Sequence, residues 1–122
     1  MDPHETTLTK LAIADDAFYR ALAHEHDNIA ESRLDPKTHA LVRLGALIAI
    51  DATSPGYMWA VETARRFGAS DDEIAGCLIA ALPAIGVGNV VAAAPNLALA
   101  LGYDVTAALE ESGRGPSLTG AD

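Results

Sequence analysis

Three helix signatures follow one another in residues 34–86, LDPKTHALVRLGALIAIDATSPGYMWAVETARRFGASDDEIAGCLIAALPAIG. The first begins at Asp35-Pro36, because Asp can accept a hydrogen bond from an exposed amide as N-cap and Pro suits the first helical position. It continues through LVRLGALIAI, which is apolar on nearly every side. A helix that is apolar all round is a buried one, so this stretch predicts the central helix of the fold.

The next two helices have equally clear limits. Ser54-Pro55 begins the second helix, and Gly68 ends it because glycine tolerates the left-handed backbone of a C-terminal cap. Residues 70–73, SDDE, form a capping box that begins the third helix. Gly86 is expected to end it.

Before this stretch, apolar residues at three- and four-residue spacing predict one amphipathic helix from about Thr7 to His26, with Asp15 on its otherwise apolar face. Residues 24–33, HEHDNIAESR, are polar and fit a loop or a short helical turn. His24 and His26 are two residues apart, so they do not face each other on a helix and predict no metal site.

After it, a further buried helix is expected from an N-cap near Asn89 to Gly102, and a final helix from Asp104 to Gly113. Residues 114–122 have the composition of a disordered tail. No alternation with a period of two persists anywhere. The sequence therefore predicts an all-α fold, a compact bundle of about six or seven helices in one domain over residues 1–113.

Composition limits the core and the partners. Half of the residues are hydrophobic but only 5% are aromatic, so the core must consist of Ala, Leu, Ile and Val. We expect association between subunits to complete such a core, which makes a homo-oligomer the expected state. The net charge of −9 argues against nucleic acid or an anionic membrane as partner, because both would repel the chain.

Cellular location and disulfide chemistry are also limited by the sequence. No apolar run reaches the roughly 20 residues that span a bilayer, and the N-terminus MDPHETTLTK has no signal-peptide pattern, so a cytoplasmic location is expected. Cys77 is the single cysteine, which excludes an intrachain disulfide. His4 joins no recognisable cluster, and neither a metal nor an organic cofactor is expected.

Four segments together resemble the carboxymuconolactone decarboxylase family, which includes the alkylhydroperoxidase D-like proteins. They are LDPKT, RRFGAS, DDEI and IGVGNVVAAAP, and the resemblance extends from Leu34 to about Asp104. It implies a compact helical bundle whose subunits interlock as trimers or hexamers. It also implies a site at the start of the helix that begins at Ser54.

The reactive residues of the family are missing from the matching positions. In peroxidase members a CxxC motif is followed four residues later by His, and these positions fall on Thr53, Gly56 and Ala60, or on Ala52, Pro55 and Trp59 if one residue is inserted. The histidines of decarboxylating members correspond to Ala60, Ala80 and about Pro95. Thiol peroxidase chemistry needs two thiols, so the resemblance implies a scaffold without it.

Tyr57, Trp59 and Glu62 remain near the implied pocket. In a functional interpretation, Tyr57 and Trp59 line an apolar pocket, with Tyr57 a catalytic candidate, while Glu62 acts as acid or base with a pKa raised by desolvation. In a structural interpretation, Trp59 is a core or interface anchor and Glu62 pairs with Arg65 or Arg66 on the helix surface.

Arg43 is a cation inside the apolar central helix and needs a partner, because a buried guanidinium without one is costly. A structural ion pair with Asp51, Glu62 or Glu73 would supply it, and so would a bound anion. His39 lies four residues earlier on the same face, so His39 and Arg43 are candidates for binding an anion.

Three classes of function stay open. The first is a decarboxylase-like lyase or isomerase acting on a small organic acid through a rebuilt site at Tyr57, Trp59, Glu62 and Arg43. The second is a small-molecule-binding or accessory protein that kept the scaffold without catalysis. The third is residual peroxidase activity through Cys77, although a lone cysteine in an apolar helix usually behaves as a small hydrophobic residue.

Overall fold

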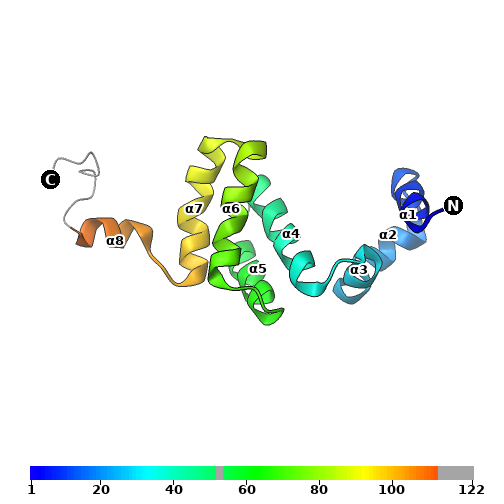
Figure 1. The fold of residues 1–122 in the computed structure, drawn as a ribbon, viewed down its shortest axis with the longest axis horizontal. Coiled ribbons are helices and arrows are strands. Elements are labelled where there is room, and N and C mark those ends of the chain that lie inside the picture. Colours follow the sequence, from blue (N-terminus) through cyan, green and yellow to red (C-terminus); the bar gives the residue numbers. More distant parts are fainter. Residues whose placement is uncertain (52–53, 113–122) are drawn as a thin grey trace. The chain divides into compact units, whose positions relative to one another are not determined.

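The computed structural model describes residues 1–51 and 54–112. Within these ranges the chain forms eight α-helices and no β-strand, which confirms the all-α prediction (Figure 1). The helices are α1 (Pro3–Ala12), α2 (Asp16–Leu22), α3 (Glu25–Ser32), α4 (Pro36–Ala49), α5 (Ser54–Arg66), α6 (Asp71–Ile85), α7 (Val87–Leu101) and α8 (Val105–Glu111).

The chain divides into two compact units, Met1–His39 and Ala40–Asp122, and the division falls within α4. That one domain covers residues 1–113 stays a prediction. The predicted tail, residues 114–122, and the predicted stop at Gly113 lie outside the described residues.

The single helix predicted from about Thr7 to His26 is wrong, because α1 and α2 occupy that range with a break between them. Ala14 takes a left-handed backbone with φ 55°, which ends the first segment. The Asp15 carboxylate then accepts a hydrogen bond of 2.9 Å from the Phe18 amide and caps α2. Asp15 thus begins a new helix instead of continuing the old one, because its short side chain competes for backbone amides. The polar segment 24–33 forms α3 for most of its length.

The core of the second unit lies where α5 and α6 both pack against α7 (Figure 1). Its largest fully buried side chains are Tyr57, Leu44, Ile48, Ile74, Leu97 and Val61. Five of the eleven buried core residues in the described ranges are alanines. The expectation of a core made mainly from small and aliphatic residues is confirmed, with Tyr57 as the aromatic exception.

Local capping positions these helices as the sequence predicted. The Asp35 carboxylate accepts from the Thr38 amide at 3.3 Å at the start of α4. Ser70 and Glu73 form the capping box of α6, with hydrogen bonds of 3.0 and 2.8 Å. Gly68 lies between α5 and α6 with φ 94°, a conformation that favours glycine.

The start of α7 differs from its prediction. The helix begins at Val87, directly after Gly86, whose φ of 88° reverses the chain within one residue. Asn89 is therefore inside α7, and its side-chain amide donates to the Ile85 carbonyl at 2.6 Å instead of capping the helix. The predicted end at Gly102 is confirmed by its φ of 96°. Asp104 caps α8 as predicted, accepting from the Ala107 amide at 2.9 Å.

Among the described helices, none by itself has the length and apolar character of a bilayer span, although α7 and α8 together, bent by 91°, satisfy those two criteria.

Candidate functional site

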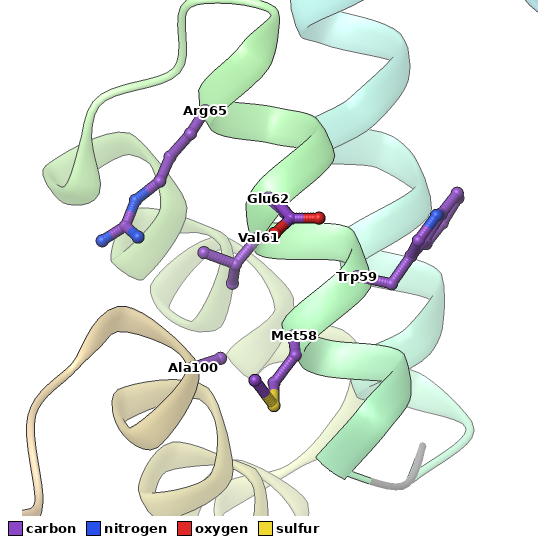
Figure 2. A pocket seen from close by; sticks show the side chains of 6 residues that line it. All are labelled: Met58, Trp59, Val61, Glu62, Arg65 and Ala100. Atoms are coloured by element: carbon purple, nitrogen blue, oxygen red, sulfur yellow. The ribbon is translucent and has the colours of Figure 1, made fainter.

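A pocket of about 390 Å³ lies along the exposed surface of α5, and we call it the α5 pocket (Figure 2). Its lining residues are Met58, Trp59, Val61, Glu62 and Arg65 from α5 and Ala100 from α7. Met58 and Val61 lie on the side of α5 that faces Ala100 of α7 (Figure 2). Trp59 points to the other side of α5 (Figure 2). The pocket therefore combines an apolar floor with an aromatic ring and two charged groups.

Arg43 of α4 contacts this pocket through Trp59. Its guanidinium carbon lies 4.4 Å from the centre of the Trp59 ring, which is a cation–π contact. No carboxylate of the described residues forms an ion pair with Arg43. The structural ion pair considered from the sequence, with Asp51, Glu62 or Glu73, is therefore not found. The structure gives Arg43 an aromatic partner, which leaves its positive charge without a neutralising carboxylate in that part of the chain.

Glu62 and Arg65 both line the pocket but do not pair. The Glu62 carboxylate and the Arg65 guanidinium point to different sides of α5 (Figure 2). The Glu62 side chain is exposed, so the described residues do not give it the burial expected for an acid–base role. It also forms no ion pair with any of them. The surface pair between Glu62 and Arg65 is absent as well.

Arg65 instead connects three helices. Its Nε donates to an Asp71 carboxylate oxygen at 3.0 Å, and Nη2 donates to the Leu101 carbonyl at 3.2 Å. The hydrogen bond to Asp71 raises the pKa of the Arg65 guanidinium, so the side chain stays charged. These two bonds fix the orientation of Arg65 beside the pocket.

Tyr57 does not line the α5 pocket. The residue is fully buried, and its hydroxyl has no hydrogen-bond partner among the described residues. Burial raises the pKa of this phenol, and the charge of Asp51 raises it further. Tyr57 is thus a core residue, and a role in catalysis stays a prediction that its position does not support directly.

His39 is also buried, and its imidazole forms a hydrogen bond with a residue of α3. Its Nε2 lies 2.7 Å from Oδ1 of Asn28. The amide nitrogen of Asn28 donates to the Leu22 carbonyl at 2.8 Å, so Oδ1 is the atom that faces the imidazole. Because that oxygen only accepts, Nε2 carries the proton. The contact links α3 to the start of α4, and an anion-binding role for His39 stays a prediction.

Cys77 on α6 is half-buried. Its Sγ lies 3.8 Å from the Leu41 carbonyl oxygen and 3.7 Å from that of Glu73. Burial raises the pKa of the thiol, so the thiol form predominates at neutral pH.

Three exposed side chains at the N-terminus form a cluster that the sequence analysis missed. Asp2, His4 and Glu5 have ligand atoms within 4.8 Å of one another. Glu5 already accepts a hydrogen bond of 2.7 Å from the Asp2 amide as part of the α1 capping box. Helix capping accounts for this arrangement.

Comparison with known proteins gives one match. The chain matches no curated protein and no solved structure. The model of the carboxymuconolactone decarboxylase family matches residues 16–98, which are 83 of the 122 residues. The match confirms the resemblance and begins earlier than Leu34, at the start of α2. The chain belongs to the carboxymuconolactone decarboxylase family.

Proposed function

We propose that this protein binds a small organic acid in the α5 pocket and that it does so without thiol peroxidase chemistry. The observation that carries the proposal is the pocket itself, where Arg65 lies beside an apolar floor and Arg43 lies over the Trp59 ring. The family name refers to a lactone acid that loses a carboxyl group. Such a ligand carries its carboxylates on a compact five-membered lactone ring.

Arg65 is the proposed anchor for the carboxylate. A guanidinium has five N–H donors, and the bonds to Asp71 and to the Leu101 carbonyl use two of them. The remaining donors can form charge-assisted hydrogen bonds with a carboxylate in the pocket. Because Arg65 is already held in one orientation, little side-chain entropy would be lost when the ligand binds.

Arg43 supplies a second positive charge behind the Trp59 ring. Because no carboxylate of the described residues pairs with it, the Arg43 guanidinium favours an anion nearby. Trp59 is also among the lining residues, and Met58, Val61 and Ala100 form the apolar part of the pocket toward α7. The volume of about 390 Å³ is at the lower end of the range for small-molecule sites.

Glu62 is the proposed proton donor if the bound acid loses CO₂. Decarboxylation leaves an electron pair on carbon, so the site needs a positive charge to stabilise it and an acid to protonate the carbon. Glu62 is the carboxyl group among the residues that line the pocket. A lyase and a non-catalytic binding protein would thus use the same site. They differ in whether Glu62 donates a proton to the ligand.

The number and the environment of the cysteines argue against thiol peroxidase chemistry. The chain has one cysteine, so no resolving thiol exists within it. The half-buried Cys77 has a raised pKa and is therefore a poor source of the nucleophilic thiolate.

Calorimetric titration with carboxymuconolactone and with its uncharged dimethyl ester tests the binding proposal. We expect the acid to bind and the ester to bind at least about tenfold more weakly, because the charge-assisted hydrogen bonds to Arg65 are lost. Arg65→Gln should weaken binding of the acid by a similar factor, and Arg43→Gln should weaken it less.

Two variants serve as controls for this titration. Asp71→Asn removes a negative charge beside Arg65 but keeps a side-chain oxygen that can accept from its Nε, so the acid should bind at least as tightly as to the unsubstituted protein. Cys77→Ser should leave binding unchanged. Equal binding of acid and ester, or unchanged binding by both Arg43→Gln and Arg65→Gln, would overturn the proposal.

Release of CO₂ from the bound lactone acid distinguishes the two forms of the function. Turnover that Glu62→Gln abolishes, while binding persists, identifies a lyase. Binding without turnover by the unsubstituted protein identifies a binding or accessory protein on the same scaffold.

A further inference from the structure

The α5 pocket contains two groups of opposite charge on one helix. Arg65 and Glu62 both line it and are three residues apart on α5. Residues at this spacing are neighbours on a helix surface. Their charged ends nevertheless point to different sides of α5 (Figure 2). A ligand that lies along the pocket can therefore meet a positive group and a negative group at separate points.

Glu62 has bonding capacity that the protein does not use. Within residues 1–51 and 54–112 its carboxylate forms neither an ion pair nor a side-chain hydrogen bond. An ionised carboxylate only accepts hydrogen bonds, through two oxygens. The ligand group that lies beside Glu62 must therefore be a donor, and a hydroxyl or an ammonium group meets this requirement.

A second carboxylate on the ligand is disfavoured at the same place. It has the same charge as Glu62 and no proton to donate, and both properties reduce affinity. Arg43 is not among the lining residues, because its guanidinium lies over the Trp59 ring at 4.4 Å. The charged group that a second carboxylate meets in the pocket itself is thus Glu62.

The other lining residues suit a hydrocarbon part of the ligand. Besides the Trp59 ring they are Met58, Val61 and Ala100, none of which carries a polar side-chain group that donates hydrogen bonds. A short carbon chain or a ring can contact them while its polar groups reach Arg65 and Glu62.

We propose that the α5 pocket selects an organic acid that also carries a hydrogen-bond donor, either a hydroxyl or an ammonium group, and that Glu62 determines this preference. The inference rests on the proposed function, in the form in which Glu62 keeps its charge and does not donate a proton. Arg65 binds the carboxylate of the ligand, Glu62 accepts from the donor, and dicarboxylic acids bind less well.

Calorimetric titration with matched acids tests this inference. Butanoic, pentanoic and hexanoic acid are compared with their ω-hydroxy and ω-amino derivatives and with the dicarboxylic acid of the same carbon number. At least one hydroxy or amino acid should bind at least about threefold more tightly than its parent acid, because a hydrogen bond to a charged group is added. The dicarboxylic acid should bind no more tightly than the parent acid. The order of the hydroxy and amino acids identifies the preferred donor.

Glu62→Gln should remove the discrimination against dicarboxylic acids. The amide both donates and accepts, so dicarboxylic acids should bind at least about threefold more tightly than to the unsubstituted protein. Glu110→Gln is the matched control, because Glu110 is an exposed glutamate of α8 outside the pocket and its substitution changes the net charge equally. It should leave the order of affinities unchanged.

The fluorescence of Trp59 gives a second measurement. Trp59 is the single tryptophan of the chain and lines the pocket. Its emission should change as each acid binds and should give the same order of affinities as calorimetry.

The outcomes separate this inference from the proposed function. If a dicarboxylic acid bound more tightly than the hydroxy and amino acids, or if Glu62→Gln left the preference unchanged, the inference alone would be overturned. The same holds if carboxymuconolactone bound but no hydroxy or amino acid did. Failure of every acid to bind, carboxymuconolactone included, would overturn the proposed function and the inference with it.

Discussion

At the scale of single residues, Tyr57 combines complete burial with a hydroxyl that has no hydrogen-bond partner in the described ranges, 1–51 and 54–112. A buried polar group without a partner costs about 1–3 kcal/mol of stability. The ring fills the core beside aliphatic and alanine side chains and stabilises the fold. The hydroxyl without a partner lowers that stability.

Tyr57→Phe should therefore raise the free energy of unfolding by about 1 kcal/mol, measured by urea denaturation. Tyr19→Phe is the matched control, since its hydroxyl donates to the Leu11 carbonyl at 2.8 Å and its loss should not stabilise the protein. An equal effect of both substitutions would contradict the explanation. Weaker binding of an organic acid by Tyr57→Phe would instead support a direct role of Tyr57 in the site.

The same variant has an expected pH dependence. Burial raises the pKa of Tyr57 above its ordinary value of 10.0. The folded state therefore holds the proton at a pH where the unfolded state has lost it, so stability is fully present below about pH 10 and falls as the pH rises through the folded pKa. The difference between Tyr57→Phe and the unsubstituted protein should widen above that pH.

At the scale of elements, the start of α6 depends on the reciprocal hydrogen bonds of Ser70 and Glu73. This helix carries Ile74 into the core. The capping box thus supports the core.

Ser70→Ala should lower the free energy of unfolding by about 1 kcal/mol, because the Glu73 amide loses its acceptor. Ser70→Thr keeps a hydroxyl at the same place and should lose much less. The urea midpoints of the two variants measure the difference. If they coincide, the cap contributes nothing to stability.

At the scale of the whole molecule, the net charge of −9 opposes association of identical chains. Salt screens this repulsion, while an uncharged contact has no ion pairs for salt to weaken.

The homo-oligomer expected from the small-residue core should therefore become tighter as the salt concentration rises from about 0.01 to about 0.1 M, over which the Debye length falls from about 30 to about 10 Å. Sedimentation equilibrium at the two concentrations measures the dissociation constant. Association that weakens with salt would indicate an interface built from ion pairs.

The sequence by itself determined the family, the all-α class and most helix limits from Pro36 to Glu111. Those limits depend on groups a few residues apart, such as the Ser70 hydroxyl and the Glu73 amide, so local chemistry decides them. The sequence analysis considered Arg65 only as a surface partner of Glu62, whereas the structure places Met58 and Arg65 in the lining of the pocket.

Only the tertiary structure decided the break before Asp15, the aromatic partner of Arg43, the burial of Tyr57 and the presence of Ala100 in the α5 pocket. For the last three, the reason is that these contacts join residues from different helices, whose relative positions follow from packing of the whole core. At Asp15 two local preferences compete, apolar periodicity and capping, and the sequence pattern does not say which prevails.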